Sequence, residues 1–163
     1  MDGRLIDNVK TVMGCAPAAL TATAGDGDYV NLKNFAKLRI TLSVLNAASG
    51  VTGGTITLKQ ASAVAGTGEK ALSFSKMFAN LDCAAGDTMT ETAVTSDTFT
   101  TPTTASKQLL YVIEVDASSL DIANGFDCVR IDSTGMVAAV GCAIYDLYGS
   151  RYSSPIDVSA IID

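Results

Sequence analysis

The sequence contains no histidine and no tryptophan, and the missing histidine excludes several kinds of enzyme chemistry. Without histidine, the chain lacks the usual general base of Ser and Cys nucleophiles and the commonest nitrogen ligand of zinc. Cys15 and Cys142 each follow a glycine, but they lack the flanking pattern of a nucleophile elbow. The acidic residues are dispersed, so spacing places no carboxylate pair across a scissile bond. We therefore expect a protein that is not an enzyme.

The missing tryptophan weighs against carbohydrate binding along the most hydroxyl-rich stretch of the chain. Residues 88–101, TMTETAVTSDTFTT, are dense in threonine, whose branched β-carbon favours strands and whose hydroxyl faces solvent. A hydroxyl-rich strand can recognise sugars, but carbohydrate-binding faces normally add exposed Trp or Tyr rings. We expect a polar hairpin or a sheet edge here, anchored by Val94 and Phe99.

Charged residues make up only 17% of the chain, and their balance is acidic, with a net charge of −6. The pI is near 4.5, and the 11 Lys and Arg residues are scattered singly. A protein that coats nucleic acid or anionic lipid needs a concentrated basic patch, so we expect no nucleic-acid partner. The longest apolar run is far shorter than a membrane span, and residues 1–14 lack the features of a secretory signal. We expect no membrane association and no export by a standard signal.

The cysteines and the glycine-rich stretches form no recognisable metal or cofactor motif. The chain has 4 cysteines and no C-x-x-C spacing. We expect buried structural thiols, especially at Cys128 and Cys142, although an even number leaves one or two disulfides open. Asp26 and Asp28 could begin a calcium loop, but the further ligands are missing. Residues 65–68, AGTG, have too few glycines for a phosphate-binding loop and precede a strand-like run instead of a helix. We therefore expect no metal and no cofactor.

What the sequence does contain favours an all-β protein. Hydrophobic residues make up 48% of the 163 residues, and Thr, Ser, Ala and Gly are abundant. We expect an antiparallel β-sandwich of about eight strands, for which a jelly roll is one candidate arrangement. Residues 28–163 are assigned to this single domain with its C-terminal tail. Residues 1–27 are assigned to an extended, partly docked N-terminal arm, because Gly14 and Pro17 argue against a long element there.

Residues 108–132, QLLYVIEVDASSLDIANGFDCVRID, form the predicted centre of the fold. The first run, 108–116, is apolar on one face and largely apolar on the other, which is typical of a central strand. The second run places Val129 and Ile131 on one face. Asn124-Gly125 closes the connection and supplies a left-handed turn at little steric cost. We expect the two runs to be neighbouring strands.

Other stretches also have strand patterns. Residues 37–45 alternate strictly, and their even-numbered residues are predicted to face the core. Residues 55–59 resume this alternation after a loop of small residues, and we expect the two runs to pair as antiparallel neighbours. Residues 71–78 place Lys76 on an otherwise apolar face, which indicates a sheet edge or a bulge. Residues 136–145 are apolar on both faces, as in a central strand.

Near the C-terminus, Tyr148, Arg151 and Tyr152 precede a short apolar tail. Tyr and Arg are enriched at protein interfaces because they combine contact area with directional hydrogen bonds, so these three are the candidate partner-binding residues. The tail either packs on its own core or reaches a partner. Residues 1–27 are likewise either a frayed terminus or an arm that lies on a neighbouring subunit.

Six motifs follow one another along the chain: GDYVNLKNF, which ends at Phe35, then ITLKQA (56–61), GTGEKALSFSK (66–76), TSDTFT (95–100), VIEVDASSLDIANGFDCVRID (112–132) and RYSSP (151–155). In this order they resemble a family of small structural proteins encoded among the head genes of tailed bacteriophages. NGFDCVRID is the most specific of them. The resemblance implies a β-sandwich virion protein, a decoration or cement protein on the outside of the capsid, with no active site.

The resemblance implies one function, and a second function of a different class is kept as the alternative. The first is a non-enzymatic capsid decoration protein that binds the outer shell and stabilises adjacent capsomers, with the major capsid protein as its partner. It implies assembly in the host cytoplasm, a place on the capsid surface of the virion, and a homo-oligomer, of which a trimer fits the three-fold sites of capsids. The alternative is a β-sandwich recognition module of a tail, fibre or baseplate that binds a host-surface glycan or protein.

Overall fold

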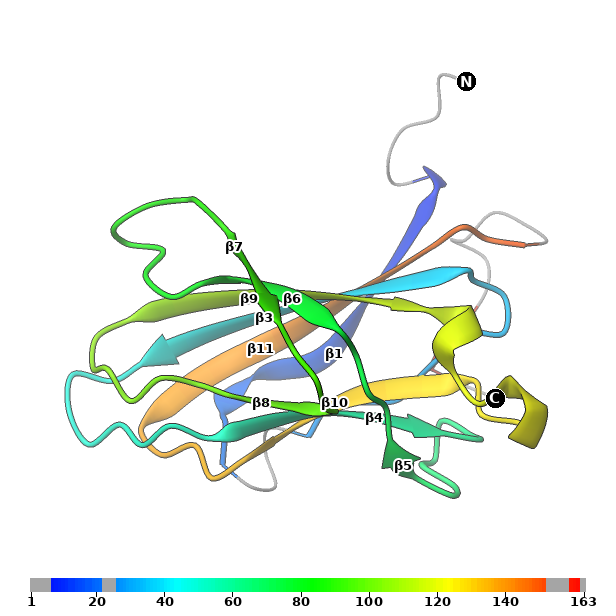
Figure 1. The fold of residues 1–163 in the computed structure, drawn as a ribbon, viewed down its shortest axis with the longest axis horizontal. Helices are drawn as coiled ribbons and strands as arrows, with labels where there is room; N and C mark the ends of the chain where they lie inside the picture. Colours follow the sequence, from blue (N-terminus) through cyan, green and yellow to red (C-terminus); the bar gives the residue numbers. More distant parts are fainter. Residues whose placement is uncertain (1–6, 22–25, 152–158, 162–163) are drawn as a thin grey trace.

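The computed structural model describes residues 7–21, 26–151 and 159–161 as two antiparallel β-sheets packed face to face (Figure 1). Two short 3₁₀ helices, η2 (Ala117–Ser119) and η3 (Ile122–Asn124), separate the ninth and tenth strands. None of the helices in the described residues is long and apolar enough to cross a membrane. The strands, in chain order, are β1 (Val9–Ala19), β2 (Val30–Asn31), β3 (Lys37–Asn46), β4 (Thr55–Ala61), β5 (Lys70–Ala71), β6 (Lys76–Asn80), β7 (Thr90–Ala93), β8 (Thr98–Thr100), β9 (Gln108–Asp116), β10 (Cys128–Thr134) and β11 (Ala139–Tyr148).

The two sheets differ in width. The wide sheet has the strand order β1-β11-β3-β9-β6-β7, and the narrow sheet has the order β2-β10-β4-β5, with β8 also paired to β4. The expected all-β sandwich is therefore confirmed. Eleven strands are described instead of about eight, because β2, β5, β7 and β8 are only two to four residues long. Such short strands contain too few residues for an alternation to be visible in the sequence.

Strict alternation along the long strands builds the core between the sheets. The even-numbered residues of β3 from Leu38 to Val44 are buried, as predicted, while Arg39 and Ser43 point outward. On β9, the odd-numbered residues from Leu109 to Val115 are buried in the same way. The narrow sheet contributes buried side chains from β4 and β10 that face them. Each fully buried aliphatic side chain stabilises the fold by about 1.5–3 kcal/mol, so this layer is the main source of stability.

The predicted strand neighbours are wrong in two places. β9 and β10 lie in different sheets, although residues 108–132 were expected to form a pair. β3 and β4 also lie in different sheets, although 37–45 and 55–59 were expected to be neighbours. Alternation fixes which face of a strand is buried, but it does not select the strand beside it. The left-handed turn is present at Gly125, with φ of 80°, but it ends η3 as the chain passes between the sheets.

The run 71–78 also divides between the sheets. β5 belongs to the narrow sheet and β6 to the wide sheet, so the chain crosses just before Lys76. The crossing changes which residues face inward: Met77 and Ala79 are buried, whereas Phe78 is 37% exposed on the outside. The charged Lys76 on an otherwise apolar face therefore marks the point where the chain changes sheet. The expectation that 71–78 form one continuous strand is wrong.

Residues 9–19 of the predicted arm are extended, as expected, but they form β1, an edge strand of the wide sheet. The expectation that Gly14 and Pro17 prevent a long element is therefore wrong. β1 pairs antiparallel with β11, and the register shifts between Met13 and Cys15 and again between Cys15 and Ala18. This part of the segment 1–27 is thus hydrogen bonded to the sandwich. The division of the chain at residue 27 stays a prediction.

A fully buried tyrosine links the two sheets through a hydrogen bond. Tyr145 lies on β11 of the wide sheet, and its hydroxyl accepts a 3.1 Å hydrogen bond from the backbone N–H of Ile131 on β10. A Cβ at Gly14 would overlap with ring carbons of Tyr145, and a Cβ at Gly27 would overlap with its hydroxyl oxygen. These glycines therefore allow the backbone to pass close to the ring.

None of the four cysteines, all of which lie in the described residues, forms a disulfide, so the disulfide alternative does not apply. Cys15 and Cys128 are buried, whereas Cys83 and Cys142 are half-buried. The prediction of a buried thiol is thus confirmed at Cys128 and only partly met at Cys142. Burial raises the pKa of the Cys15 thiol, which keeps it protonated and unreactive at neutral pH.

Candidate functional site

The outer face of the wide sheet carries the candidate site. Four long strands, β1, β11, β3 and β9, lie side by side there, and their register brings residues that are far apart in sequence into rows (Figure 1). One row runs from Thr11 through Asp146 and Arg39 to Glu114. A second row, two residues further along, runs from Met13 through Ile144 and Thr41 to Val112. The first row is polar and the second largely apolar.

The polar row forms part of a hollow of about 680 Å³, here called the polar hollow. Its size is within the usual range of small-molecule pockets. The hollow is lined by Asn8, Val9, Thr11, Arg39, Glu114, Asp146, Tyr148 and Gly149.

The polar groups of the hollow are held in place by one another. Asp146 accepts a 2.6 Å hydrogen bond from the Thr11 hydroxyl, and its other carboxylate oxygen accepts bonds of 3.2 and 2.5 Å from Nε and Nη2 of Arg39. The Asp146 side chain is 12% exposed, whereas that of Arg39 is 48% exposed. The carboxylate is therefore buried and fixed, and the guanidinium extends from it toward solvent.

Tyr148 forms the opposite side of the hollow. Its hydroxyl donates a 2.8 Å hydrogen bond to Glu114, and Val9 is its cross-strand partner on β1. Burial, and then the hydrogen bond to Glu114, raise the pKa of Tyr148 to about 12. The phenol therefore remains neutral, and its ring is held against the wall of the hollow.

Beside the hollow, five large apolar side chains are exposed on the same face of the sheet. They are between 37% and 51% exposed. Met13 and Ile144 are cross-strand partners, as are Leu45 and Val140, while Phe78 is the partner of half-buried Val112. Single exposed apolar residues are normal on protein surfaces, but several on one face of a sheet indicate an interaction surface. We call this group the apolar band; it consists of Met13, Leu45, Phe78, Val140 and Ile144.

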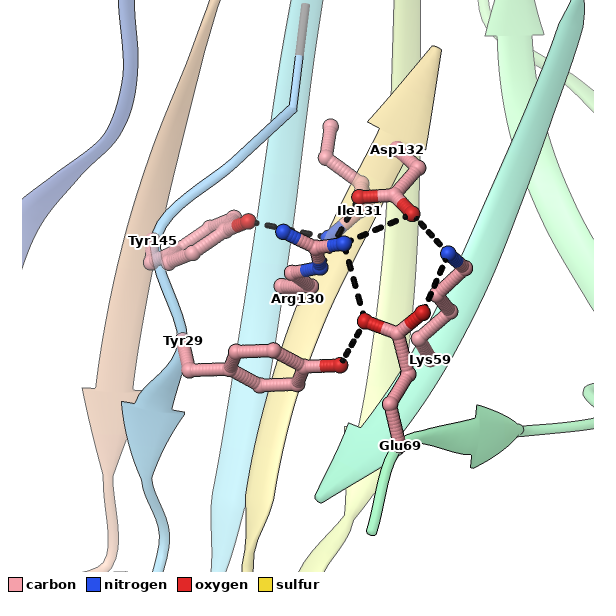
Figure 2. A network of polar contacts seen from close by, with 7 residues as sticks. All are labelled: Tyr29, Lys59, Glu69, Arg130, Ile131, Asp132 and Tyr145. Atoms are coloured by element: carbon pink, nitrogen blue, oxygen red, sulfur yellow. Dashed lines mark hydrogen bonds and ion pairs between the residues drawn. The ribbon is translucent and has the colours of Figure 1, made fainter. Parts of the chain in front are cut away.

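The narrow sheet carries a separate network of ion pairs (Figure 2). Glu69 accepts hydrogen bonds from the Tyr29 hydroxyl at 2.7 Å, from Lys59 at 2.6 Å and from Arg130 at 2.8 Å. Asp132, whose side chain is 6% exposed, pairs with both Lys59 and Arg130. The guanidinium of Arg130 also stacks over the Tyr29 ring at 4.9 Å.

The network ties parts of the narrow sheet together. Lys59 belongs to β4, Arg130 and Asp132 to β10, and Glu69 to the loop before β5. The hydrogen bond from Lys59 is the first cause that holds the pKa of Glu69 below its ordinary value. Burial, and then the bond to Glu69, raise the pKa of Tyr29. Two positive and two negative groups compensate one another, so we interpret the network as structural.

The acidic pair near the start of the domain does not complete a metal site in the described part of the chain. Asp26 and Asp28 are exposed, and burial and then the Asp132 carboxylate raise the pKa of Asp26. Across residues 7–21, 26–151 and 159–161, no group of three or more His, Cys, Asp or Glu side chains is placed to hold a metal ion.

Of the three predicted partner-binding residues, one lies in the polar hollow. Tyr148 lines the hollow, whereas Arg151 is exposed and its backbone N–H donates to the carbonyl of Asn34. Tyr152 lies outside the described residues. The role of the three in partner binding stays a prediction. Sequence reasoning missed the apolar band, although the apolar outer positions of 136–145 were a signal for it, because they were assigned to a strand covered on both faces.

Comparisons with known proteins identify no family for this chain. No family model matches the sequence, and no curated protein matches it. Among solved structures, the chain is similar to the crystal structure of SPBc2 prophage-derived protein YomS. The two share 12% sequence identity with a TM-score of 0.46, over 87% of this chain and 94% of that chain. A likeness of this size assigns no function.

Proposed function

We propose that this chain is a non-enzymatic structural protein of a bacteriophage virion, a decoration protein that binds the outer surface of the capsid and stabilises adjacent capsomers. The observation that carries the proposal is the apolar band on the wide sheet. The motifs that resemble phage head proteins support the same assignment.

The apolar band has the properties of a protein-binding surface. Its members come from β1, β3, β6 and β11, which are held in one rigid hydrogen-bonded sheet. The row from Thr11 to Glu114 borders the band with polar groups. An apolar centre with a polar rim is the usual anatomy of a specific protein interface. A rigid surface also loses little conformational entropy when it binds.

A decoration protein stabilises a shell because it binds only the assembled state. Binding that favours one state lowers the free energy of that state by mass action, so a protein that spans two capsomers opposes their separation. The major capsid protein is thus the proposed partner, and the outer surface of the capsid is the proposed location of this protein in the virion. The proposed homo-oligomer, a trimer, would place copies of the band around a three-fold axis.

The test is co-sedimentation with empty, expanded shells of the encoding phage. We expect the protein to pellet with shells and to bind isolated capsid subunits poorly. Exchanging both Val140 and Ile144 for Thr keeps β-branched residues on β11 and should weaken shell binding by at least about tenfold. Ile122→Thr is the matched control, because Ile122 is 54% exposed on η3, away from the band.

Three results would contradict the proposal. They are a wild-type protein that stays in the supernatant, a double variant that pellets as well as wild type, and equal binding to shells and to isolated subunits.

A second candidate function, a recognition module of a tail, fibre or baseplate, is favoured by the polar hollow, which has the size and polarity of a ligand site.

A further inference from the structure

We propose that the polar hollow at Tyr148 binds an uncharged carbohydrate. The proposal is independent of shell binding, because the hollow and the apolar band are separate sets of residues on one face. It rests on the charges, the hydrogen-bonding groups and the apolar wall of the hollow.

The charges of the hollow favour an uncharged ligand. Asp146 and Arg39 neutralise each other through their ion pair, and Glu114 adds one negative charge near the rim. A phosphate or a sulfated sugar would face two carboxylates, and a free metal cation would face the guanidinium of Arg39 beside Asp146. A polyhydroxyl ligand avoids both repulsions, because each of its hydroxyls can donate to a carboxylate and accept from the guanidinium.

The hydrogen-bonding groups are fixed before any ligand arrives. Asp146 is held by Thr11 and Arg39, and Glu114 is held by the Tyr148 hydroxyl. Arg39, Glu114, Asp146 and Tyr148 stand on β3, β9 and β11, each of which is hydrogen bonded to a strand on both sides. Thr11 stands on β1, the edge strand beside β11. Arg39 presents five N–H donors, of which Asp146 uses only some. Polar groups that are already oriented bind at a low entropic cost.

The apolar wall supplies the second feature that sugars need. Sugar rings present C–H groups on one face, and an aromatic ring with a polar tip suits such a ligand. Tyr148 and Val9, cross-strand partners, form this wall. The absence of tryptophan therefore does not exclude a sugar site, because the ring of Tyr148 can supply the aromatic surface.

The experiment is a titration of the whole chain, ¹⁵N-labelled, followed by two-dimensional NMR. The probes are the methyl glycosides of glucose, galactose, mannose and N-acetylglucosamine at millimolar concentration, with methyl glucuronide and inorganic phosphate as anionic comparisons. We expect at least one neutral glycoside to shift the backbone amides of Thr11, Arg39, Glu114, Asp146 and Tyr148. We expect no comparable shifts with the two anions.

Two variants with matched controls test the site. Glu114→Gln removes the exposed carboxylate and should weaken glycoside binding by about tenfold, while Glu91→Gln changes an exposed carboxylate elsewhere on the wide sheet and should leave binding unchanged. Tyr148→Ala removes the aromatic wall and should abolish the shifts, while Phe126→Ala removes an aromatic ring that belongs neither to the hollow nor to the apolar band and should not.

The proposal is overturned if no neutral glycoside shifts these amides, if phosphate shifts them instead, or if Glu114→Gln binds as wild type does. Glu114 is exposed, so its variant is expected to fold, and a melting curve verifies this for each variant. Shell binding is measured separately. A protein that binds shells and no glycoside would overturn this inference alone, and one that binds a glycoside and no shells would overturn only the decoration function.

Discussion

At the scale of single residues, the buried ring of Tyr145 limits which side chains can replace the residues that pack against it. Gly14 lies against the ring, so Gly14→Ala forces the ring or β1 to move. We expect a loss of about 1–3 kcal/mol in the free energy of unfolding, measured with denaturant. Gly86→Ala is the control, because a Cβ there meets nothing within 4 Å, and its stability should be unchanged within about 0.5 kcal/mol. Equal stability of the two variants would contradict this account.

Two buried tyrosines offer a matched test of a single hydroxyl. Tyr145→Phe leaves the buried N–H of Ile131 without its acceptor and should destabilise the protein by about 1–3 kcal/mol. Tyr111 is just as buried, but its hydroxyl has no hydrogen-bond partner, so Tyr111→Phe should be neutral or stabilising. Thermal melts of both variants provide the measurement. A larger loss at Tyr111 than at Tyr145 would show that the bond to β10 is unimportant.

At the scale of elements, the ion network of the narrow sheet links β4 to β10. Asp132→Asn removes a buried charge and leaves Lys59 and Arg130 to share Glu69, so we expect a loss of about 3 kcal/mol in the free energy of unfolding. The control Glu91→Gln breaks the pair with Lys76, in which both side chains are more than half exposed, and should cost less than about 1 kcal/mol. Denaturant unfolding compares them, and similar losses would contradict a structural role for the network.

The same network predicts how stability changes in acid. The pKa of Glu69 is lowered in the folded state, so its contribution is complete above its ordinary value of 4.5 and is lost as the pH falls through the folded pKa. Between pH 6 and pH 3, the Glu69→Gln variant should therefore lose less stability than wild type. The difference between the two proteins isolates Glu69 from the other carboxylates. Parallel pH profiles would contradict the assignment.

The sequence predicted the elements better than their arrangement. The buried faces of β3 and β9 follow from alternation alone, because each residue type reports whether its own side chain meets water. Which strand lies beside β9 depends on how the connection through η2 and η3 crosses the sandwich, and no local residue preference specifies that crossing. The polar hollow was out of reach for the same reason, since Thr11, Asp146 and Glu114 meet only through the register of four strands.

At the scale of the whole molecule, two surface features have opposite effects on self-association. The net negative charge makes copies repel one another, whereas the apolar band favours contact between them. Near pH 4.5 the net charge vanishes, and the band is then free to drive self-association. We expect turbidity to peak near this pH in concentrated wild-type protein. The protein with Val140→Thr and Ile144→Thr should stay clear, and Ile122→Thr should behave as wild type. Equal turbidity in all three would show that the band does not govern association.

The pairing of β1 with β11 has a consequence for how the chain is made. The hydrogen-bonded side chains Thr11 and Asp146 are 135 positions apart, so β1 leaves the ribosome about ten seconds before its partner strand exists. During that interval an extended strand with free backbone groups is open to pairing with other chains. Gly14 and Pro17 interrupt the regular hydrogen-bond ladder of β1, which makes the unpaired strand a poorer partner for other chains. A chain released before residue 139 would leave β1 without its partner and one side of β3 open to aggregation.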